Sequence, residues 1–242
     1  MIKGIYSSAS GMVPSVRKQE LHANNIANAK TTGFKKDIQF NRELNKAEAK
    51  TQTKKSDWQQ PLIDQTFVDY SSGAFDKTDN PLDMAIEGDG FFVLMDEEGN
   101  QYLSRAGMFE VSSDGLIQFP GGLTLNGEGG PIEIGQGELS VSQTGEVQVD
   151  GLTVNQIVPQ TVDDMSRLEK VGSSMFRVPE GVDLFASAQP IIRQGYLETA
   201  NLNIVQEMVD MIVTYRTFEA NSKALQSQDS SLEHLFGKVG GR

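Results

Sequence analysis

The sequence has no cysteine and only two histidines, His22 and His234, in 242 residues. The absence of cysteine excludes disulfides, thiolate metal sites and cysteine nucleophiles. Two histidines are too few for a histidine-rich metal site, and a Ser-His-Asp triad would have to use one of them. The usual side chains of metal and nucleophilic chemistry are therefore scarce.

Long hydrophobic runs and net positive charge are also missing. No apolar run reaches the roughly 18 residues that a membrane-spanning helix needs, and the first residues lack the apolar core of a cleavable signal peptide. The formal net charge is −12, which makes the chain a poor binder of nucleic acid phosphates. We expect no membrane span and no nucleic acid partner, and if the protein leaves the cytoplasm, it does so by a route other than a cleavable signal peptide.

The charge is unevenly distributed along the chain. Residues 1–55 carry 11 Lys and Arg against 4 Asp and Glu, whereas residues 56–242 carry 10 against 29. One interpretation is a solvated basic linker. The other is attraction between the basic end of one copy and the acidic remainder of another, which would steer association.

The first 28 residues show a helical pattern. Apolar residues recur at heptad spacing, with polar Gln19 at the one skipped position, and they are Ile2, Ile5, Ala9, Met12, Val16, Ala23 and Ile26. Pro14 predicts either a kink or a helix that begins there. The residues that follow, Thr31 to Gly33, predict the end of the helix.

Asn24, Asn25 and Asn28 stand near the end of this helix, beside small alanines. Asparagine is a poor helix former, so the three residues could mark a frayed end. Alternatively, buried asparagine amides could fix the register against another helix. Both interpretations stay open at this point.

The last 40 residues give the strongest helical pattern. Positions spaced alternately by four and three residues run without a proline, and the apolar ones are Ile204, Met208, Met211, Tyr215, Phe218, Leu225, Leu232 and Phe236. Val205, Val209 and Ile212 widen the stripe at its start. Asn203 with Gln206 resembles a capping box, and Gly237 stands where a C-cap is expected. The predicted helix is about 50 Å long.

Between the helices, residues 66–195 switch to short strands separated by turns. Turn dipeptides recur as EG/GN, DG, NG and TG pairs, and the runs between them are β-branched or aromatic; we expect strands at 91–94, 116–119, 147–149, 152–154 and 156–158. The predicted fold class is α+β, with terminal helices paired as a coiled-coil-like shaft and a central antiparallel all-β body. We divide the chain into a helical segment (1–40), a polar link of uncertain structure (41–65), the β body (66–195) and a C-terminal helix (196–242).

The C-terminal helix needs a partner. Burial of its eight apolar residues is worth roughly 12–24 kcal/mol, against on the order of 50 kcal/mol for ordering its chain. The N-terminal helix is the available partner within the chain, but it is short and rich in alanine. We therefore expect apolar surface to remain for contacts with other copies.

No motif for chemistry is convincing. Residues 88–93 (GDGFFV) begin like a dinucleotide fingerprint but lead into a strand. The acidic stretches 76–80 and 96–100 do not fit an EF-hand loop, a G-x-S-x-G elbow is absent, and the carboxylates of the β region form no obvious glycosidase pair. We predict no catalytic residue, no metal ligand and no cofactor.

Several segments together resemble flagellar basal-body rod proteins. They occur in the order of the family and reach both ends of the chain: 7–12 (SSASGM), 23–28 (ANNIAN), 31–35 (TTGFK), 80–92 (NPLDMAIEGDGFF), 102–109 (YLSRAGMF), 195–205 (GYLETANLNIV) and 216–221 (RTFEAN). The length and the short link look more like the proximal rod proteins, with the distal rod proteins as the near alternative.

The resemblance implies a non-enzymatic structural subunit. Such subunits are exported through the flagellar type III apparatus and polymerise, with neighbouring rod proteins, into the hollow driveshaft that crosses the periplasm and transmits torque. Terminal helices line that tube. The predicted assembly residues are therefore the heptad positions given above together with the three asparagines.

Two other classes of protein remain as alternatives. One is a β-rich module or enzyme that acts on cell-wall glycan, although Trp58, the single tryptophan, lies outside the β body. The other is a coiled-coil scaffold unrelated to flagella.

Overall fold

The computed structural model describes residues 2–42, 62–135, 137–188 and 190–239. Its internal contacts divide the chain into two compact units. The helical unit comprises Met1–Ala27, Asp37–Val68 and Asn203–Arg242, and the β body comprises Asn28–Lys36 and Asp69–Leu202. The chain therefore passes between the units four times, and each unit is assembled from segments far apart in the sequence.

Helix α1 spans Ile2–Ala27 and continues through Pro14. The prediction of a helix that begins at Pro14 is therefore wrong. Proline costs one backbone hydrogen bond, but packing against a second helix can outweigh such a local penalty. The helix ends before the predicted stop, where Gly33 takes a φ of 65° that favours glycine.

Helix α2 spans Ile204–Val239, which corresponds to about 54 Å. The side-chain oxygen of Asn203 accepts hydrogen bonds from the amides of Val205 (3.0 Å) and Gln206 (3.2 Å), so the predicted cap forms. The side chain of Gln206 donates to Asp210 instead of returning to the cap. Gly237 lies inside the helix, and its predicted role as a C-cap is wrong because glycine also accepts helical angles.

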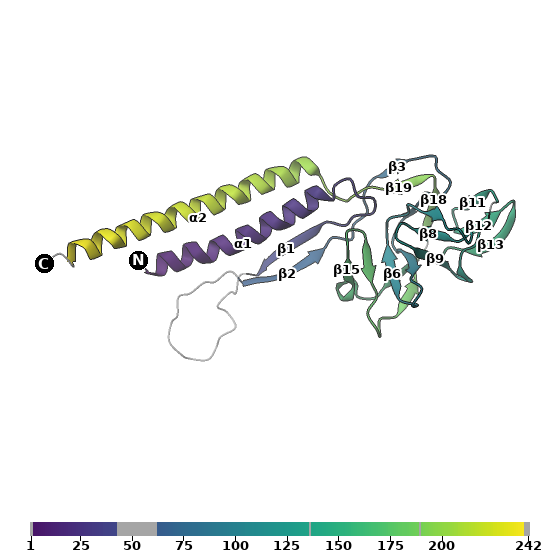
Figure 1. Cartoon of the computed structure of the whole chain (residues 1–242), viewed down its shortest axis with the longest axis horizontal. Coiled ribbons are helices and arrows are strands. Elements are labelled where there is room, and N and C mark those ends of the chain that lie inside the picture. The colour runs from purple at the N-terminus through teal and green to yellow at the C-terminus, as the bar shows by residue number, and fades with distance from the viewer. Residues whose placement is uncertain (1, 43–61, 136, 189, 240–242) are drawn as a thin grey trace. The chain divides into compact units, whose positions relative to one another are not determined.

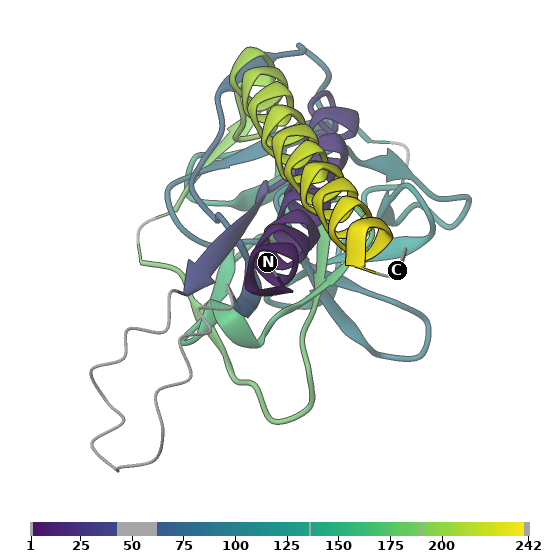
Figure 2. The same cartoon turned by 90° about the vertical axis from the view of Figure 1, so that its left-hand side faces the viewer.

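The two helices lie side by side and run antiparallel (Figures 1 and 2). This confirms the predicted pairing of the two ends of the chain. A two-stranded antiparallel ribbon completes the helical unit, formed by β1 (Asp37–Arg42) and β2 (Leu62–Val68). The outer parts of the predicted polar link thus belong to strands, while residues 43–61, with Trp58, lie outside the described residues.

All strand pairs among the described residues of the β body are antiparallel, which confirms the predicted fold class. Its largest sheet runs in the order β15 (Glu169–Val171), β16 (Met175–Arg177), β6 (Gln101–Ser104), β5 (Phe92–Met95), β9 (Leu123–Gly127), β8 (Ile117–Phe119) and β7 (Glu110–Val111), with β10 (Gly130–Pro131) paired to β9.

The remaining described strands of the body form smaller sheets. They are β11 (Leu139–Val141) with β12 (Glu146–Val149) and β13 (Leu152–Gln156); β14 (Gln160–Val162) with β17 (Leu184–Ala186); β18 (Ile191–Gln194) with β4 (Met84–Glu87); and β19 (Tyr196–Glu198) with β3 (Phe75–Lys77). A short 3₁₀ helix, η1, spans Met165–Arg167. Residues from β4, β5, β8, β9, β11, β12 and β18, among them Phe92, Leu125 and Val147, form one buried core together with residues of connecting loops.

Four of the five predicted strands are present at or near the expected positions. The fifth, 156–158, is wrong beyond Gln156, where β13 ends. The predicted turn at Asn126 and Gly127 lies within β9, whereas Asp150 and Gly151 form a turn with positive φ at both residues.

Candidate assembly surface

The interface between α1 and α2 follows a heptad on each helix. On α1, the residues that are wholly or partly buried on this side include Ser8, Met12, Ser15, Gln19, His22 and Ile26. On α2 they include Glu207, Met211, Thr214, Phe218, Asn221, Leu225, Gln228 and Leu232. Polar and apolar residues alternate along α2, so the interface within the chain is only half apolar.

The polar residues at one end of this interface bond to one another. His22 Nδ1 lies 2.6 Å from Glu207 Oε2, and Asn25 Nδ2 lies 3.4 Å from the same oxygen. The buried Asn25 amide also exchanges two hydrogen bonds with the backbone of Asp37, at 3.0 and 3.1 Å. One network thus joins α1, α2 and β1, and it satisfies polar groups that would be costly to bury alone.

Further along, the helices approach closely at a small residue. A side chain at Gly11 would place its Cβ only 3.1 Å from Nδ2 of Asn221. The helices are close at this point, and a larger residue at Gly11 would need the Asn221 side chain to shift by a few tenths of an ångström.

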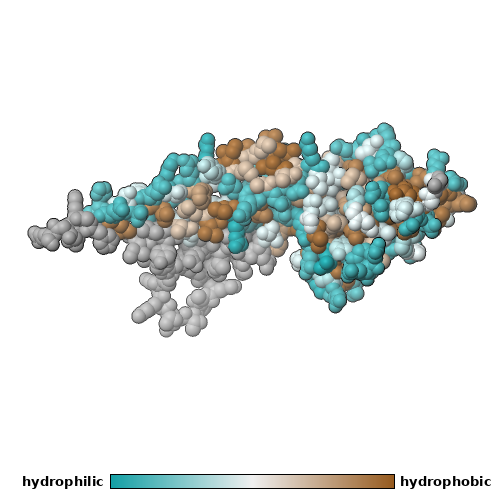
Figure 3. Space-filling view, in the orientation of Figure 1, coloured by the Kyte–Doolittle hydropathy of each residue, from teal (hydrophilic) through white to brown (hydrophobic). Residues whose placement is uncertain are grey.

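The opposite side of α2 is apolar and exposed. Val205, Met208, Val209, Ile212 and Val213 are each between 48% and 70% exposed, and Ile204 and Tyr215 lie beside them. We call these first five residues the outer face. They recur at helical spacing on the side away from Glu207 and Thr214. Figure 3 shows hydrophobic side chains gathered over this part of α2.

The outer face ends after the first three turns. Beyond Tyr215 the corresponding positions are polar apart from the small Ala220, and Lys223 forms an exposed ion pair with Glu219 at 2.7 Å. The hydrogen bond from Lys223 lowers the pKa of the Glu219 carboxyl. Over its first three turns α2 thus presents a half-polar interface to α1 and an apolar outer face on the opposite side, while the rest of its outer side is mostly polar.

The structure places the predicted assembly residues in two groups. Met12, Ile26, Met211, Phe218, Leu225 and Leu232 lie in the helix interface, whereas Ala9, Val16, Ala23, Ile204, Met208 and Tyr215 are exposed. The side chains of Ile2, Ile5 and Phe236 lie outside the described part. Asn25 is buried, Asn24 is exposed, and Asn28 accepts hydrogen bonds from Thr31 in the turn after α1.

Val213 lies on the outer face but is not among the residues predicted from the sequence. The signal was available, since apolar residues occur as doublets at 204–205, 208–209 and 212–213. Doublets at helical spacing indicate an apolar arc wider than one partner helix can cover.

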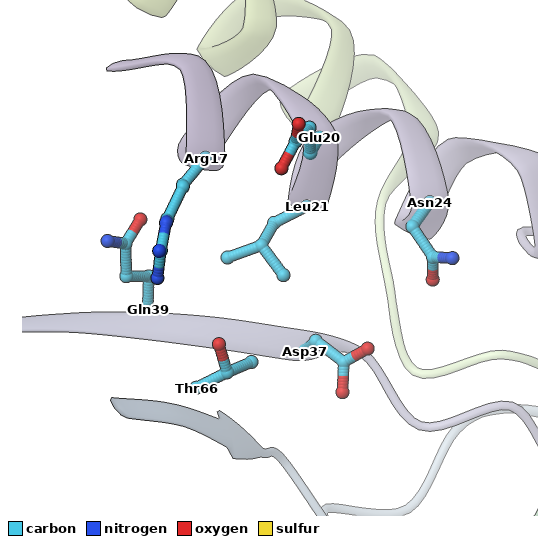
Figure 4. A pocket seen from close by; sticks show the side chains of 7 residues that line it. All are labelled: Arg17, Glu20, Leu21, Asn24, Asp37, Gln39 and Thr66. Atoms are coloured by element: carbon cyan, nitrogen blue, oxygen red, sulfur yellow. The ribbon is translucent and has the colours of Figure 1, made fainter. Parts of the chain in front are cut away.

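Other exposed apolar side chains of the helical unit are fewer. Val13 and Val16 are exposed on α1, and Ile38 and Phe67 face each other across the ribbon. A groove of about 530 Å³ separates α1 from the ribbon, lined by Arg17, Glu20, Leu21, Asn24, Asp37, Gln39 and Thr66 (Figure 4). Its mixed charges and open shape favour no small ligand.

The described residues contain no group of His, Asp and Glu side chains that could hold a metal ion. Within the same residues, neither helix has the length and apolarity to cross a bilayer.

Three family descriptions match the chain. "Flagella basal body rod protein" matches residues 5–35, "Flagellar hook protein FlgE/F/G D1 domain" matches 85–149, and "Flagellar basal body rod FlgEFG protein C-terminal" matches 193–235. The first and last cover much of α1 and α2, and the second covers part of the β body.

Full-length relatives agree with these matches. The chain is 31% identical to the flagellar basal-body rod protein FlgG of Bacillus subtilis, covering 97% of this chain and 98% of the relative. It is 30% identical to FlgG of Borreliella burgdorferi, over 96% and 97%. It is 27% identical to the flagellar basal-body rod protein FlgF of Rhizobium meliloti, over 100% and 99%. The chain belongs to the flagellar basal-body rod protein family, in the group of the rod proteins FlgG and FlgF, and is a structural subunit of the flagellum.

Proposed function

We propose that this rod subunit assembles through its paired terminal helices, and that the outer face of α2 is covered by a neighbouring rod subunit. The observation that carries the proposal is the exposed apolar outer face itself. An apolar surface of this kind on a helix is typical of a protein–protein contact. In the assembled state the helix pair would transmit torque along a hollow rod.

The energetics favour an interface that extends beyond the outer face of α2. The five outer-face residues are about half exposed, so their complete burial would contribute roughly 4–8 kcal/mol. Association costs about 4–15 kcal/mol before any contact is counted. The outer face therefore needs additional contacts, and Val13, Val16 and the Ile38–Phe67 pair are the apolar candidates in the same unit.

The remaining parts of the proposal rest on family membership. We infer that the chain catalyses no reaction, that it reaches its site through the flagellar type III apparatus without a cleavable signal peptide, and that it works in the periplasmic part of the rod. Its predicted partners are copies of itself and neighbouring rod proteins. The described residues of the β body do not favour the alternative of a glycan-binding module.

A charge on the outer face tests the proposal. Ile212→Asp should abolish rod assembly and swimming, because an unpaired carboxylate would be buried in the contact. Ser230→Asp is the matched control: it lies 18 residues later, which is five helical turns, on the same line of α2, and it is already polar and exposed. It should swim normally.

Circular dichroism of the two purified variants should show the same helix content, since neither residue faces α1. Normal assembly of Ile212→Asp would contradict the proposal. Equal loss of assembly in both variants would contradict it too, because the effect would then be independent of the outer face.

A further inference from the structure

Three charged residues from distant parts of the chain meet in the interior of the β body. Lys35 and Glu198 are fully buried, and Arg105 is nearly so. Lys35 Nζ donates to Glu198 Oε1 at 2.6 Å, and Arg105 Nη1 donates to Glu198 Oε2 at 3.4 Å. The three residues come from three of the segments that carry the family resemblance, at 31–35, 102–109 and 195–205.

The cluster also holds the backbone around it. Glu198 Oε1 accepts the amide of Gly73 at 2.9 Å, and Lys35 Nζ donates to the carbonyl of Ser71 at 2.7 Å. Arg105 donates to the carbonyls of Ile86 (3.1 Å) and Gly88 (2.7 Å). Four separate stretches of the body are thereby tied to one carboxylate.

These stretches include the points where the chain enters and leaves the body. The chain crosses between the units after Ala27, Lys36, Val68 and Leu202. Asn201 links three crossings: its Oδ1 accepts the amide of Lys36 at 2.8 Å, and its Nδ2 donates to the carbonyl of Asp69 at 2.7 Å.

The segment after the first crossing, residues 28–36, is also bonded to Glu198 and to Asp69. The amide of Gly33 donates to the carbonyl of Glu198 at 2.8 Å, and the amide of Asp69 donates to the carbonyl of Lys36 at 2.9 Å. All four crossings are therefore joined within the body by the residues around Glu198 and Asn201.

Such a cluster is a costly way to gain stability alone. Burial lowers the pKa of Lys35 against the opposing attraction of Glu198, and burial lowers the pKa of Arg105 in the same way. Buried ion pairs often contribute no more than apolar side chains of similar size, whereas removal of one partner is strongly destabilising. In some proteins such pairs instead hold particular segments in one arrangement.

We propose that Lys35, Arg105, Glu198 and Asn201 form a junction clamp, which keeps the four chain crossings together when force on the terminal helices reaches the β body. The inference rests on the proposed role in torque transmission. Torque carried by the chain must pass through these crossings. Without the clamp, segments 28–36 and 196–202 would peel from the body before its core strands yield.

Single-molecule force measurements on the full chain test the clamp. The absence of native cysteine allows handles at chosen pairs of exposed residues. Handles at Lys30→Cys and Ser113→Cys load the segment that enters the body. Handles at Glu97→Cys and Ser113→Cys load the core strands without that segment. Glu198→Gln removes the central charge with little change of shape, and Glu87→Gln makes the same change at the half-exposed Glu87–Arg193 pair.

Glu198→Gln should raise the opening rate at a given force on the order of 100-fold along the Lys30–Ser113 axis, and leave the Glu97–Ser113 axis unchanged. Glu87→Gln should change neither. Equal weakening along both axes would overturn the clamp and indicate general destabilisation, and no weakening along the first axis would also overturn it. Because the measurement uses single soluble chains, its outcome is independent of whether the outer face of α2 mediates assembly.

Discussion

At the scale of single residues, polar side chains hold the crossings of the chain in place. Burial acts to raise the pKa of Asp69, but hydrogen bonds from Ser71 and the nearby Lys36 outweigh it and hold the pKa below its ordinary value. The Asp69 carboxylate lies 3.0 Å from the amide of Ser71 and 3.4 Å from Lys36 Nζ. Its charge therefore favours the folded β body.

This lowered pKa predicts a specific acid sensitivity. The stabilisation by Asp69 should be complete above its unfolded pKa, near 3.8, and should be lost as the pH falls through the lower folded pKa. Asp69→Asn should reduce stability at neutral pH and should flatten the dependence on pH below about 4. Urea unfolding at pH 3 to 7 measures both. An unchanged acid slope in Asp69→Asn would show that other carboxylates control it.

At the scale of elements, the antiparallel helix pair has a polar interface at the end where α2 begins. The contact of His22 with Glu207 lies where an ordinary coiled coil would have apolar residues. Polar groups there fix the register of the helices and leave the apolar side of α2 free.

Removal of the histidine tests that role. His22→Ala leaves the Glu207 carboxylate largely buried with only the distant Asn25 amide, so the helix pair should lose about 1–3 kcal/mol. The matched control is His234→Ala, which changes the only other histidine, exposed on α2, and it should have little effect. Hydrogen exchange of α1 and α2 amides measures the difference. Equal protection in both variants would show that the contact between His22 and Glu207 does not stabilise the helix pair.

The heptad positions of the sequence coincide only in part with the interface between the helices. Met12, Ile26, Met211 and Phe218 are partly buried there, but the alternate positions shift by one residue, from Met208 to Glu207 and from Tyr215 to Thr214. Periodicity reports how many apolar residues a helix has, but not which partner each one meets. Where a helix has two partners, the pattern is the sum of two interfaces.

The buried cluster of charged residues could not be predicted from the sequence. Lys35, Arg105 and Glu198 lie within segments that carry the family resemblance, yet nothing in their spacing shows that they meet, because their contact depends on sheet topology. The β1–β2 ribbon was missed for a similar reason, since its strands pair across 19 intervening residues.

At the scale of the whole molecule, the two ends of the chain are folded in a single copy, yet they leave apolar surface exposed. The outer face of α2 has no cover among the described residues. The β body, by contrast, encloses its own core. This division suits a subunit whose ends make the contacts of a polymer and whose body folds independently of them.

The most direct test measures access to the outer face before and after assembly. In a chain without native cysteine, Val209→Cys provides a single thiol at its centre. Alkylation should be fast in the soluble full chain and slower by on the order of tenfold or more in purified basal bodies, with fast reaction restored when the rods are dissociated. Equally fast alkylation in intact rods would show that the outer face stays open to solvent, and would contradict assembly through it.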